Sequence, residues 1–410
     1  MITVIGIDGG PLPEEAAAAL AEASCVVGAR RHLDAVPVPD RARPVPLTSL
    51  VPALEEARAA VGSAVILASG DPGFFGIVRA LREQGDQPRV VPAVSSVATA
   101  FARIGLAWDD AVVASAHGRG GGDRSAGRAL AAALAHPKAA VLTAPGTAEP
   151  AEFLPALLDA GRDVYVAQRL GSADEEVTRV TPESAERDWP HPNVVLAVDP
   201  RHAVASAPPW TPGHRLAPDG WALEDAEFEH RDSMITKPEV RACALAHLAP
   251  RPGTTVWDVG AGSGSVAVEC ARFGAHAVAF ERNPQDCERI RRNAAAFDVY
   301  VTVREGAVPG TADAQRGHPP PDALFLGGGD DAAAAATVRR WRPHRVVAAL
   351  ASVDRVGTMY HLLTETGYET SGTQLQASRL SPLPNGSLRF DAANPVTLLW
   401  GVLPEAGGTQ

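Results

Sequence analysis

Short apolar runs rich in β-forming residues alternate with stretches rich in Ala, Leu and Arg from residue 1 to about 198. The apolar runs read TVIGID, SAVILAS, RVVPAV, AVVASAHG, AAVLTAP, DVYVAQ and NVVLAV. Runs of this length predict strands, and the stretches between them predict helices. Because strands and helices alternate, we expect an α/β fold on a largely parallel sheet.

The pattern breaks between residues 201 and 232, where Pro, Gly and charged residues are dense and no periodicity is sustained. A helix is expected over residues 237–248, after which the alternation resumes. The later strands read TVWDVG, HAVAFE, VYVTVRE, DALFLGG, RVVAALA and VTLLWGV. We therefore predict a domain over residues 1–200, a linker over 201–232 and a second α/β domain over 233–410.

The composition fits a globular protein, with 46% hydrophobic and 21% charged residues. The apolar runs are short, so no transmembrane helix is expected, and the opening MITVIGID lacks the features of a secretion signal. We expect a cytoplasmic protein. The net charge of -11 disfavours a large nucleic-acid surface. Local basic clusters at residues 30–32, 41–43, 291–292 and 339–342 can still bind a small anion, although each is more often a solvated face.

Four cysteines are scattered at positions 25, 243, 270 and 287, without a C-x-x-C pair or a histidine at ligand spacing. Buried free thiols are the simpler interpretation, so neither a disulfide framework nor a metal site is expected.

The stretch VWDVGAGSGSVAVE at residues 256–269 carries the strongest chemical signal. Glycines at alternate positions after a strand permit a tight turn and close approach of a ligand to the next helix. A dinucleotide fingerprint needs Gly at position 265, where this chain has Ser, so the spacing favours the loop of S-adenosylmethionine-dependent methyltransferases. The candidate cofactor-binding residues of this loop are Gly260, Ala261, Gly262, Ser263 and Gly264.

The next strand ends at Glu281, whose carboxylate can accept hydrogen bonds from both ribose hydroxyls of a nucleoside. A glycine loop alone is often only a tight turn, but a loop followed by an acidic strand tip favours nucleotide-type binding. Three further glycines at 327–329 replace the Asn/Asp-Pro-Pro-aromatic clamp that is common where exocyclic base amines are methylated. This segment leaves room for a bulky flat acceptor, or is simply a flexible loop.

Two segments of the front half carry candidate ligand contacts, each of which also has a purely structural explanation. Asp71, in Gly-Asp-Pro, follows the strand VILAS and either contacts a ligand or forms a turn. Ser95 and Ser96 open a helix, where they cap it and can present N–H groups to a carboxylate.

The segments MITKPEVRA, DVGAGSGSVAVECA and FERNP resemble the decarboxylating precorrin methyltransferase domains of cobalamin biosynthesis, from about Arg231 to the end of the chain. The resemblance implies a Rossmann-like class I methyltransferase fold. It also implies that Thr236, the loop from Gly260 to Gly264 and Glu281 contact S-adenosylmethionine. A further contact is implied in an E-G-D-A-P segment, which here reads EGAVP and places Ala307 where Asp is usual.

The front half resembles the tetrapyrrole methylase family through IGIDGG, SGDPGFFG, PAVSSVATAFARIGLAWDDA and AQRLGSADE. This resemblance implies two lobes, about 1–111 and 112–200, with S-adenosylmethionine in the cleft between them. The usual G-x-G-P-G loop is altered, since Asp8 and Gly9 replace Gly and Pro, and Gln168 stands where Glu is common. The cofactor-binding residues implied for this half are Gly9, Gly10, Gly70, Asp71, Phe74, Ser95 and Ser96.

A fusion in this order resembles the decarboxylating precorrin-6Y methyltransferases. That resemblance implies methylation of precorrin-6B at carbon 5 by the front domain, and methylation at carbon 15 with loss of the ring C acetate carboxyl by the rear domain. One S-adenosylmethionine per domain and a homo-oligomer are also implied. Positioning and electrostatics suffice for such transfer, and no catalytic residue is assigned. Lys237 and Arg241, one helical turn apart, are candidates for binding the peripheral carboxylates of the tetrapyrrole.

Three alternatives remain at this stage. The substrate could be the cobalt-containing intermediate of the anaerobic pathway. A nucleic-acid methyltransferase would need a basic face and usually an aromatic clamp. The altered first loop could mean that the front half only binds the tetrapyrrole, while a single methyltransferase acts at the rear.

Overall fold

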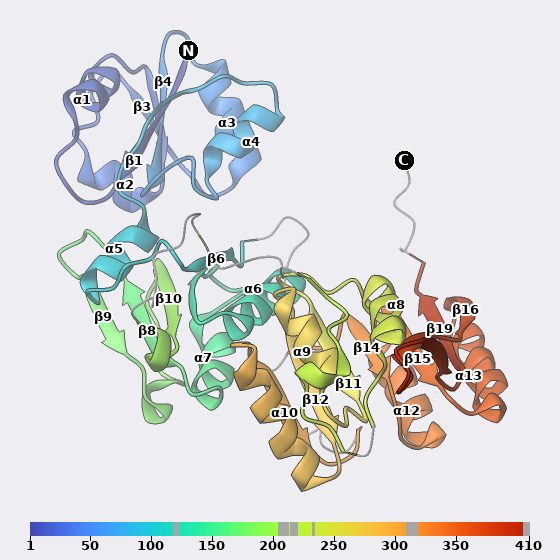
Figure 1. Cartoon of the computed structure of the whole chain (residues 1–410). Coiled ribbons are helices and arrows are strands. Elements are labelled where there is room, and N and C mark those ends of the chain that lie inside the picture. Colours follow the sequence, from blue (N-terminus) through green and yellow to red (C-terminus); the bar gives the residue numbers. More distant parts are fainter. Residues whose placement is uncertain (118–122, 204–212, 214–219, 232–233, 309–318, 405–410) are drawn as a thin grey trace.

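Three α/β units follow one another along the chain, as the computed structural model shows (Figure 1). The structure describes residues 1–117, 123–203, 213, 220–231, 234–308 and 319–404. The first two units, here called lobe 1 and lobe 2, make up the front domain, and a seven-stranded sheet with its helices forms the rear domain. The predicted α/β class, with a two-lobed front half and a Rossmann-like rear half, is confirmed.

Lobe 1 is a sheet in the order β3-β2-β4-β1-β5 in which every pair is parallel. Its central strands are continuous apolar runs because helices cover both faces. Since all strands are parallel, their carboxyl ends meet at one edge. Its elements are β1 (Ile2–Ile7), α1 (Glu14–Ala21), β2 (Cys25–Gly28), α2 (Arg30–Ala35), β3 (Arg43–Pro46), α3 (Leu50–Ala59), β4 (Ala64–Ser69), α4 (Ile77–Glu83) and β5 (Arg89–Val91).

Lobe 2 is a mixed sheet in the order β6-β7-β10-β8-β9. Strand β10 runs antiparallel to both β7 and β8, so the prediction of a largely parallel sheet is wrong for this lobe. The physical reason is that β9 and β10 follow β8 without the crossover α-helix that a parallel return needs. Its elements are α5 (Ser96–Arg103), β6 (Val112–Ser115), α6 (Asp123–Ala135), β7 (Lys138–Leu142), α7 (Pro150–Asp159), β8 (Asp163–Gln168), β9 (Glu176–Arg179), η1 (Pro182–Ser184), β10 (Asn193–Val198) and η2 (Pro200–His202).

Helix α5 belongs to the core of lobe 2. Val97 and Phe101 are fully buried and pack in one cluster with Ala140 and Leu196 of the lobe 2 sheet. The packing therefore separates the two lobes just before α5, whereas the sequence places that division near residue 112.

The rear sheet has the order β13-β12-β11-β14-β15-β19-β16, with β19 antiparallel to both of its neighbours. Strand β16 contains no apolar run and is largely exposed, so the pattern of apolar residues in the sequence does not predict it. The elements are η3 (Asp225–Glu227), α8 (Pro238–Leu248), β11 (Thr255–Val259), α9 (Ser265–Arg272), β12 (His276–Glu281), α10 (Pro284–Ala296), β13 (Val301–Glu305), β14 (Ala323–Leu326), α12 (Asp331–Trp341), β15 (Arg345–Leu350), α13 (Val353–Glu365), β16 (Glu369–Leu375) and β19 (Val396–Val402).

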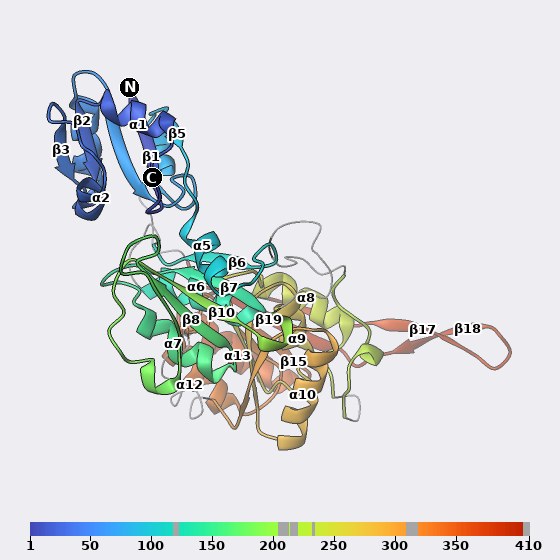
Figure 2. The same cartoon turned by 90° about the vertical axis from the view of Figure 1, so that its left-hand side faces the viewer.

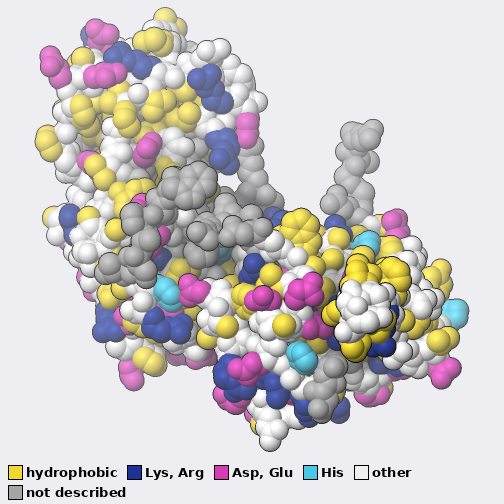
Figure 3. Space-filling model, in the orientation of Figure 1, with side chains coloured by type: hydrophobic (Ala, Val, Ile, Leu, Met, Phe, Trp, Pro, Cys, Tyr) yellow, Lys and Arg dark blue, Asp and Glu magenta, His cyan; other side chains and the backbone are white. Residues whose placement is uncertain are grey.

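A two-stranded hairpin, β17 (Ser378–Pro382) and β18 (Leu388–Ala392), projects far from the body of the rear domain (Figure 2). Leu380 pairs with Phe390 and Pro382 with Leu388, so these side chains share one face of the ribbon. Leu380, Leu388 and Phe390 are 63%, 62% and 72% exposed. Figure 3 shows the hydrophobic side chains on this part of the surface.

Residues 220–231 pack on the rear domain although the sequence assigns them to the linker. The N–H groups of Ala222 and Leu223 donate to the Glu269 carboxylate at 2.9 and 3.0 Å. Phe228 is buried with Val268 and Ala294. The rear domain therefore includes the end of the predicted linker.

Candidate active sites

The glycine loop of the rear domain connects β11 to α9, and three of its glycines have positive φ angles of 55° to 74°. A Cβ atom on Gly260 would lie 2.9 Å from the carbonyl oxygen of Gly328, and one on Gly264 would lie 2.8 Å from Ile290. Side chains are excluded at both positions by backbone conformation and by space. At Gly262 the nearest atom would be the carbonyl oxygen of Met234 at 3.7 Å, so the middle of the loop is open.

Glu281 lies at the tip of β12, beside this loop. Its carboxylate accepts hydrogen bonds from the N–H groups of Gly262 at 2.8 Å, Arg282 at 2.8 Å and Asn283 at 3.0 Å. The N–H groups of Gly260 and Ala261 donate to the carbonyl oxygen of Phe280. The loop and the acidic strand tip that the sequence singled out are therefore joined by direct hydrogen bonds.

Asp258 lies beneath the loop and is fully buried. Its carboxylate accepts the N–H of Ala267 at 3.1 Å, in the first turn of α9. Burial raises the pKa of Asp258 to about 7, and the negative charge of Glu281 adds to the shift. This carboxyl therefore fixes the helix start from below rather than facing the open side of the loop.

The remaining rear candidates lie at the same edge of the sheet. Ala307 is exposed and follows Gly306, whose N–H donates to the carbonyl oxygen of Glu281 at 2.9 Å. Ser263 is buried, and its carbonyl oxygen accepts the Asn293 side chain at 2.8 Å. Thr236 is half-buried, two residues after Met234.

The two candidate carboxylate-binding residues differ sharply in their surroundings. Arg241 is fully buried, and its Nε donates to Glu269 at 2.7 Å. Its other nitrogens donate to the carbonyl oxygens of Thr236 and Leu223. The prediction that Arg241 binds substrate is wrong, because its buried guanidinium holds the backbone at Leu223 and Thr236 next to Glu269 of α9. Lys237 is partly exposed and donates to Asp225 at 2.6 Å.

Four loops meet in the front domain at the edges where the two lobes face each other. A Cβ atom on Gly6 would lie 2.4 Å from the carbonyl oxygen of Gly70, and one on Gly9 would lie 1.7 Å from that of Gly171. Gly171 follows β8 of lobe 2, so the carboxyl ends of β1 and β8 are in contact, and the pocket beside them is here called the front cleft. Asp8 accepts hydrogen bonds from the N–H groups of Gly10 at 3.0 Å and Val94 at 3.3 Å. The altered loop thus carries its own internal carboxylate.

A pocket of about 350 Å³ lies at this edge, lined by residues 6–8, 10–13 and 92–94. Asp71 accepts the N–H of Gly73 at 2.8 Å, which is the turn interpretation of Gly-Asp-Pro. Ser95 caps α5 by accepting the N–H of Ala98 at 3.1 Å, as predicted. A Cβ on Gly70 would lie 3.1 Å from the N atom of Ser96, so these loops are in contact.

Phe74 is half-buried and packs against the lobe 2 core and, edge to face, against Phe75 at 5.0 Å. It therefore bridges the loop after β4 to the other lobe.

Arg31 also lies at this edge. Its guanidinium donates to the Ser69 hydroxyl at 2.7 Å, and that hydroxyl lies 3.2 Å from Nε2 of His32. Burial lowers the pKa of the Arg31 guanidinium and, with the Arg31 charge, lowers that of His32 to about 4, so His32 is neutral. Within the described part of the chain, Arg31 forms no ion pair with a carboxylate. The sequence identified the basic cluster but not its position beside Ser69 at the end of β4.

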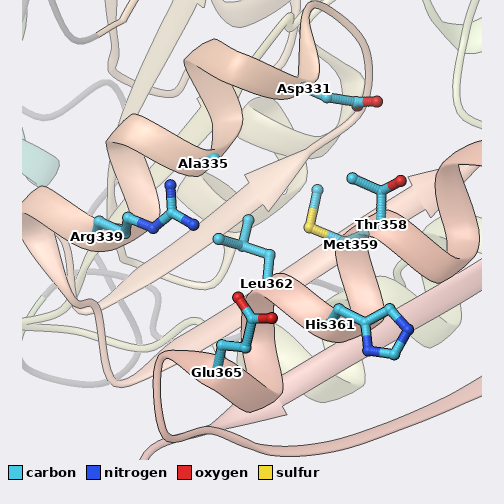
Figure 4. Close-up of a pocket in the computed structure, with 8 residues that line it drawn as sticks. All are labelled: Asp331, Ala335, Arg339, Thr358, Met359, His361, Leu362 and Glu365. Atoms are coloured by element: carbon cyan, nitrogen blue, oxygen red, sulfur yellow. The ribbon is translucent and has the colours of Figure 1, made fainter.

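A second hollow lies between α12 and α13, where Arg339, His361 and Glu365 surround Met359 and Leu362 (Figure 4). None of the residues predicted to bind the cofactor lines it. We therefore place both candidate sites at the strand ends and not in this groove.

The matches to known families follow the same division. A model described as the precorrin methyltransferase domain matches residues 226–402, and one described as tetrapyrrole (corrin/porphyrin) methylases matches residues 2–186. A precorrin-6Y C(5,15)-methyltransferase (decarboxylating) from a Sinorhizobium species is 38% identical over 341 residues, covering 80% of this chain and 78% of the relative. The chain belongs to this family.

Other decarboxylating precorrin-6Y C(5,15)-methyltransferases are similar over the same span, as in Mycobacterium tuberculosis, with 36% identity over 352 residues and 80% of both chains covered. A probable cobalt-precorrin-6B C(15)-methyltransferase (decarboxylating) from Halobacterium salinarum is 30% identical over 169 residues, covering 40% of this chain and 87% of the relative. Membership of this methyltransferase family implies S-adenosylmethionine as the methyl donor. The open space at Gly262 and the adjacent Glu281 carboxylate fit such a nucleoside.

Proposed function

We propose that the chain methylates precorrin-6B at carbons 5 and 15 and removes the carboxyl group of the ring C acetate, within cobalamin biosynthesis. The proposal is carried by two separate groups of candidate residues at strand ends, in a chain that matches decarboxylating precorrin-6Y C(5,15)-methyltransferases over about four-fifths of its length. The front cleft would serve carbon 5, and the rear loop would serve carbon 15 and the decarboxylation.

The rear site needs little from its side chains beyond positioning. When bound, S-adenosylmethionine supplies an already activated methyl group. Glu281 would accept hydrogen bonds from the ribose hydroxyls, and the N–H groups of α9 would face the ligand. The loop of Gly327, Gly328 and Gly329 would leave space for a flat macrocycle. Thr236, Ser263 and Ala307 remain candidate cofactor contacts.

Each site would hold the carboxylates of the tetrapyrrole through a cation. In the front cleft, Arg31 supports this role because its guanidinium donates to the neutral Ser69 hydroxyl at the carboxyl end of β4. A guanidinium that pairs with no carboxylate among the described residues suits a peripheral acetate or propionate. At the rear, Lys237 would exchange Asp225 for a substrate carboxylate.

One S-adenosylmethionine per domain is the part of the proposal that binding alone can test. Isothermal titration calorimetry should give two sites per chain. Gly262→Arg should remove the rear site, and Asp71→Arg should remove the front site. Besides Asp71, the residues proposed to form the front site are Gly9, Gly10, Gly70, Phe74, Ser95 and Ser96. Glu365→Ala, in the hollow between α12 and α13, should keep both.

A front half that only binds tetrapyrrole would give one site per chain, and Gly262→Arg would then abolish all binding. The alternative cobalt-containing substrate leaves the binding ratio unchanged. It would appear instead as turnover of cobalt-precorrin-6B but not of the metal-free compound.

We also propose that the chain self-associates through the β17–β18 hairpin and acts in the cytoplasm without a nucleic-acid partner. A ribbon whose apolar face projects from the body gains most by pairing with a second copy of itself. No helix within the described ranges has an apolar run long enough to span a bilayer.

A further inference from the structure

The junction between the front and rear domains lies at the amino ends of their strands. Tyr300 immediately precedes β13, and its hydroxyl donates to the Asp199 carboxylate at the end of β10. Arg162, which precedes β8, lies 3.8 Å from the centre of the Tyr300 ring. His202 pairs with Asp298 at 3.1 Å.

Because β10 is antiparallel to its neighbours, Asp199 lies at the amino ends of β7 and β8. Burial alone would raise the pKa of Asp199, but hydrogen bonds from Arg201 and Tyr300 hold it well below its usual value. A buried, fully paired carboxylate of this kind fixes the junction. Lobe 2 and the rear domain therefore share a specific interface at these edges.

Helix α6 extends the same contact. A Cβ atom on Gly253, before β11, would lie 3.6 Å from the Arg128 side chain. One on Gly274, before β12, would lie 3.5 Å from Nε2 of His136. Both glycines precede rear strands, so the rear sheet presents its amino edge to lobe 2 (Figure 1).

Both candidate sites lie at the opposite edges. The front cleft is bordered by the carboxyl ends of β1 and β8, and the rear loop follows the carboxyl end of β11. Each sheet spans five to six residues between its two edges, or about 16–20 Å at roughly 3.3 Å per residue. Two strand lengths placed amino edge to amino edge separate the sites by about 30–40 Å.

We propose that the tetrapyrrole leaves the chain between the two methyl transfers, because the two sites face away from each other across a packed junction. This inference rests on the proposed function. A relative named for the C(15) methylation and the decarboxylation alone supports it, since 87% of that relative aligns with only 40% of this chain, which leaves it no room for a second domain that would deliver its substrate. The singly methylated intermediate would therefore mix with the solution.

The test compares the wild-type chain with an equimolar mixture of two separately purified chains, Asp71→Arg and Gly262→Arg, each present at the wild-type concentration. Release predicts that the mixture forms doubly methylated product from precorrin-6B within about twofold of the wild-type rate. It also predicts singly methylated intermediate in the filtrate of the wild-type reaction. Transfer within one chain would make the mixture at least tenfold slower and leave the filtrate empty.

Two arms separate the possible causes of failure. Under release, adding Phe390→Ser to both chains should leave the rate of the mixture unchanged. If associated copies instead pass the intermediate directly to one another, loss of the hairpin contact should slow the mixture, and this result would overturn the inference. If the wild-type chain forms no methylated product, the proposed function fails. The distance between the two sites can still be measured, without any activity, by double electron–electron resonance. Spin labels at Ser95→Cys and Ala307→Cys, in a Cys243→Ser background, should lie about 30–40 Å apart. A separation below about 20 Å would overturn the inference.

Discussion

Arg241 and Glu269 form a salt bridge in which both side chains are fully buried. Removing one member of such a pair leaves an uncompensated charge, so Arg241→Met should lower the free energy of unfolding by about 3–5 kcal/mol. Denaturant unfolding of the full chain would measure this. Arg292→Met is the matched control, since its pair with Glu229 is more than half exposed and its loss should change little. Equal effects of the two substitutions would contradict a structural role for Arg241.

Asp258 makes stability depend on pH in a defined direction. Its pKa rises from 3.8 to about 7 on folding, so between about pH 4 and 7 the folded chain holds a proton that the unfolded chain has lost. The free energy of unfolding should therefore fall as the pH rises through this window, by at most about 4 kcal/mol. Asp258→Asn keeps an acceptor for the Ala267 N–H and should remove this fall. A difference between variant and wild type that stays constant from pH 4.5 to 7.5 would refute the assignment.

At the scale of the glycine loop, two neighbouring positions should separate folding from binding. Ala at either Gly262 or Gly264 costs about 1–2 kcal/mol because φ is positive. Gly264→Ala adds a clash with Ile290 of about 1–3 kcal/mol, whereas Gly262→Ala meets open space. We expect Gly264→Ala to be the less stable variant. Gly262→Ala should stay folded but bind S-adenosylmethionine at least tenfold more weakly by calorimetry, and wild-type affinity there would show that the open side is not the ligand side.

The hairpin should behave as an independent association element. Leu380→Ser with Phe390→Ser removes two of the three large apolar side chains, with Leu388, that the exposed face carries. Sedimentation velocity should then show a smaller species than the wild type, with unchanged binding of S-adenosylmethionine. The pair Arg379 and Asp391 faces the other side of the ribbon, so Asp391→Ser is the matched control. An unchanged sedimentation coefficient in the double variant would place the contact elsewhere.

Strands with continuous apolar runs, such as β1, β4 and β11, were predictable because burial on both faces leaves a signature in the sequence. Strand β3, which reads RPVP, was not, because two prolines on an edge strand remove that signature. The hairpin was missed because its alternation of polar and apolar residues serves no core within this chain.

The same contrast holds in the sites. The loop from Gly260 to Gly264 and Glu281 could be predicted because local spacing fixes their geometry. The role of Arg241 could not, since four-residue spacing places it on one helix face with Lys237 but says nothing of Glu269, 28 residues further along. The position of Arg31 beside Ser69 likewise depends on the strand order of lobe 1, which brings β2 next to β4.

At the scale of the whole molecule, the central claim is that one chain performs two methylations and one decarboxylation. The most direct test is the high-resolution mass of the product formed from precorrin-6B and methyl-labelled S-adenosylmethionine by the full chain. We predict the gain of two labelled methyl groups and the loss of one carbon dioxide. A final product with a single methyl group after the reaction has run to completion, or an unchanged substrate, would contradict the account.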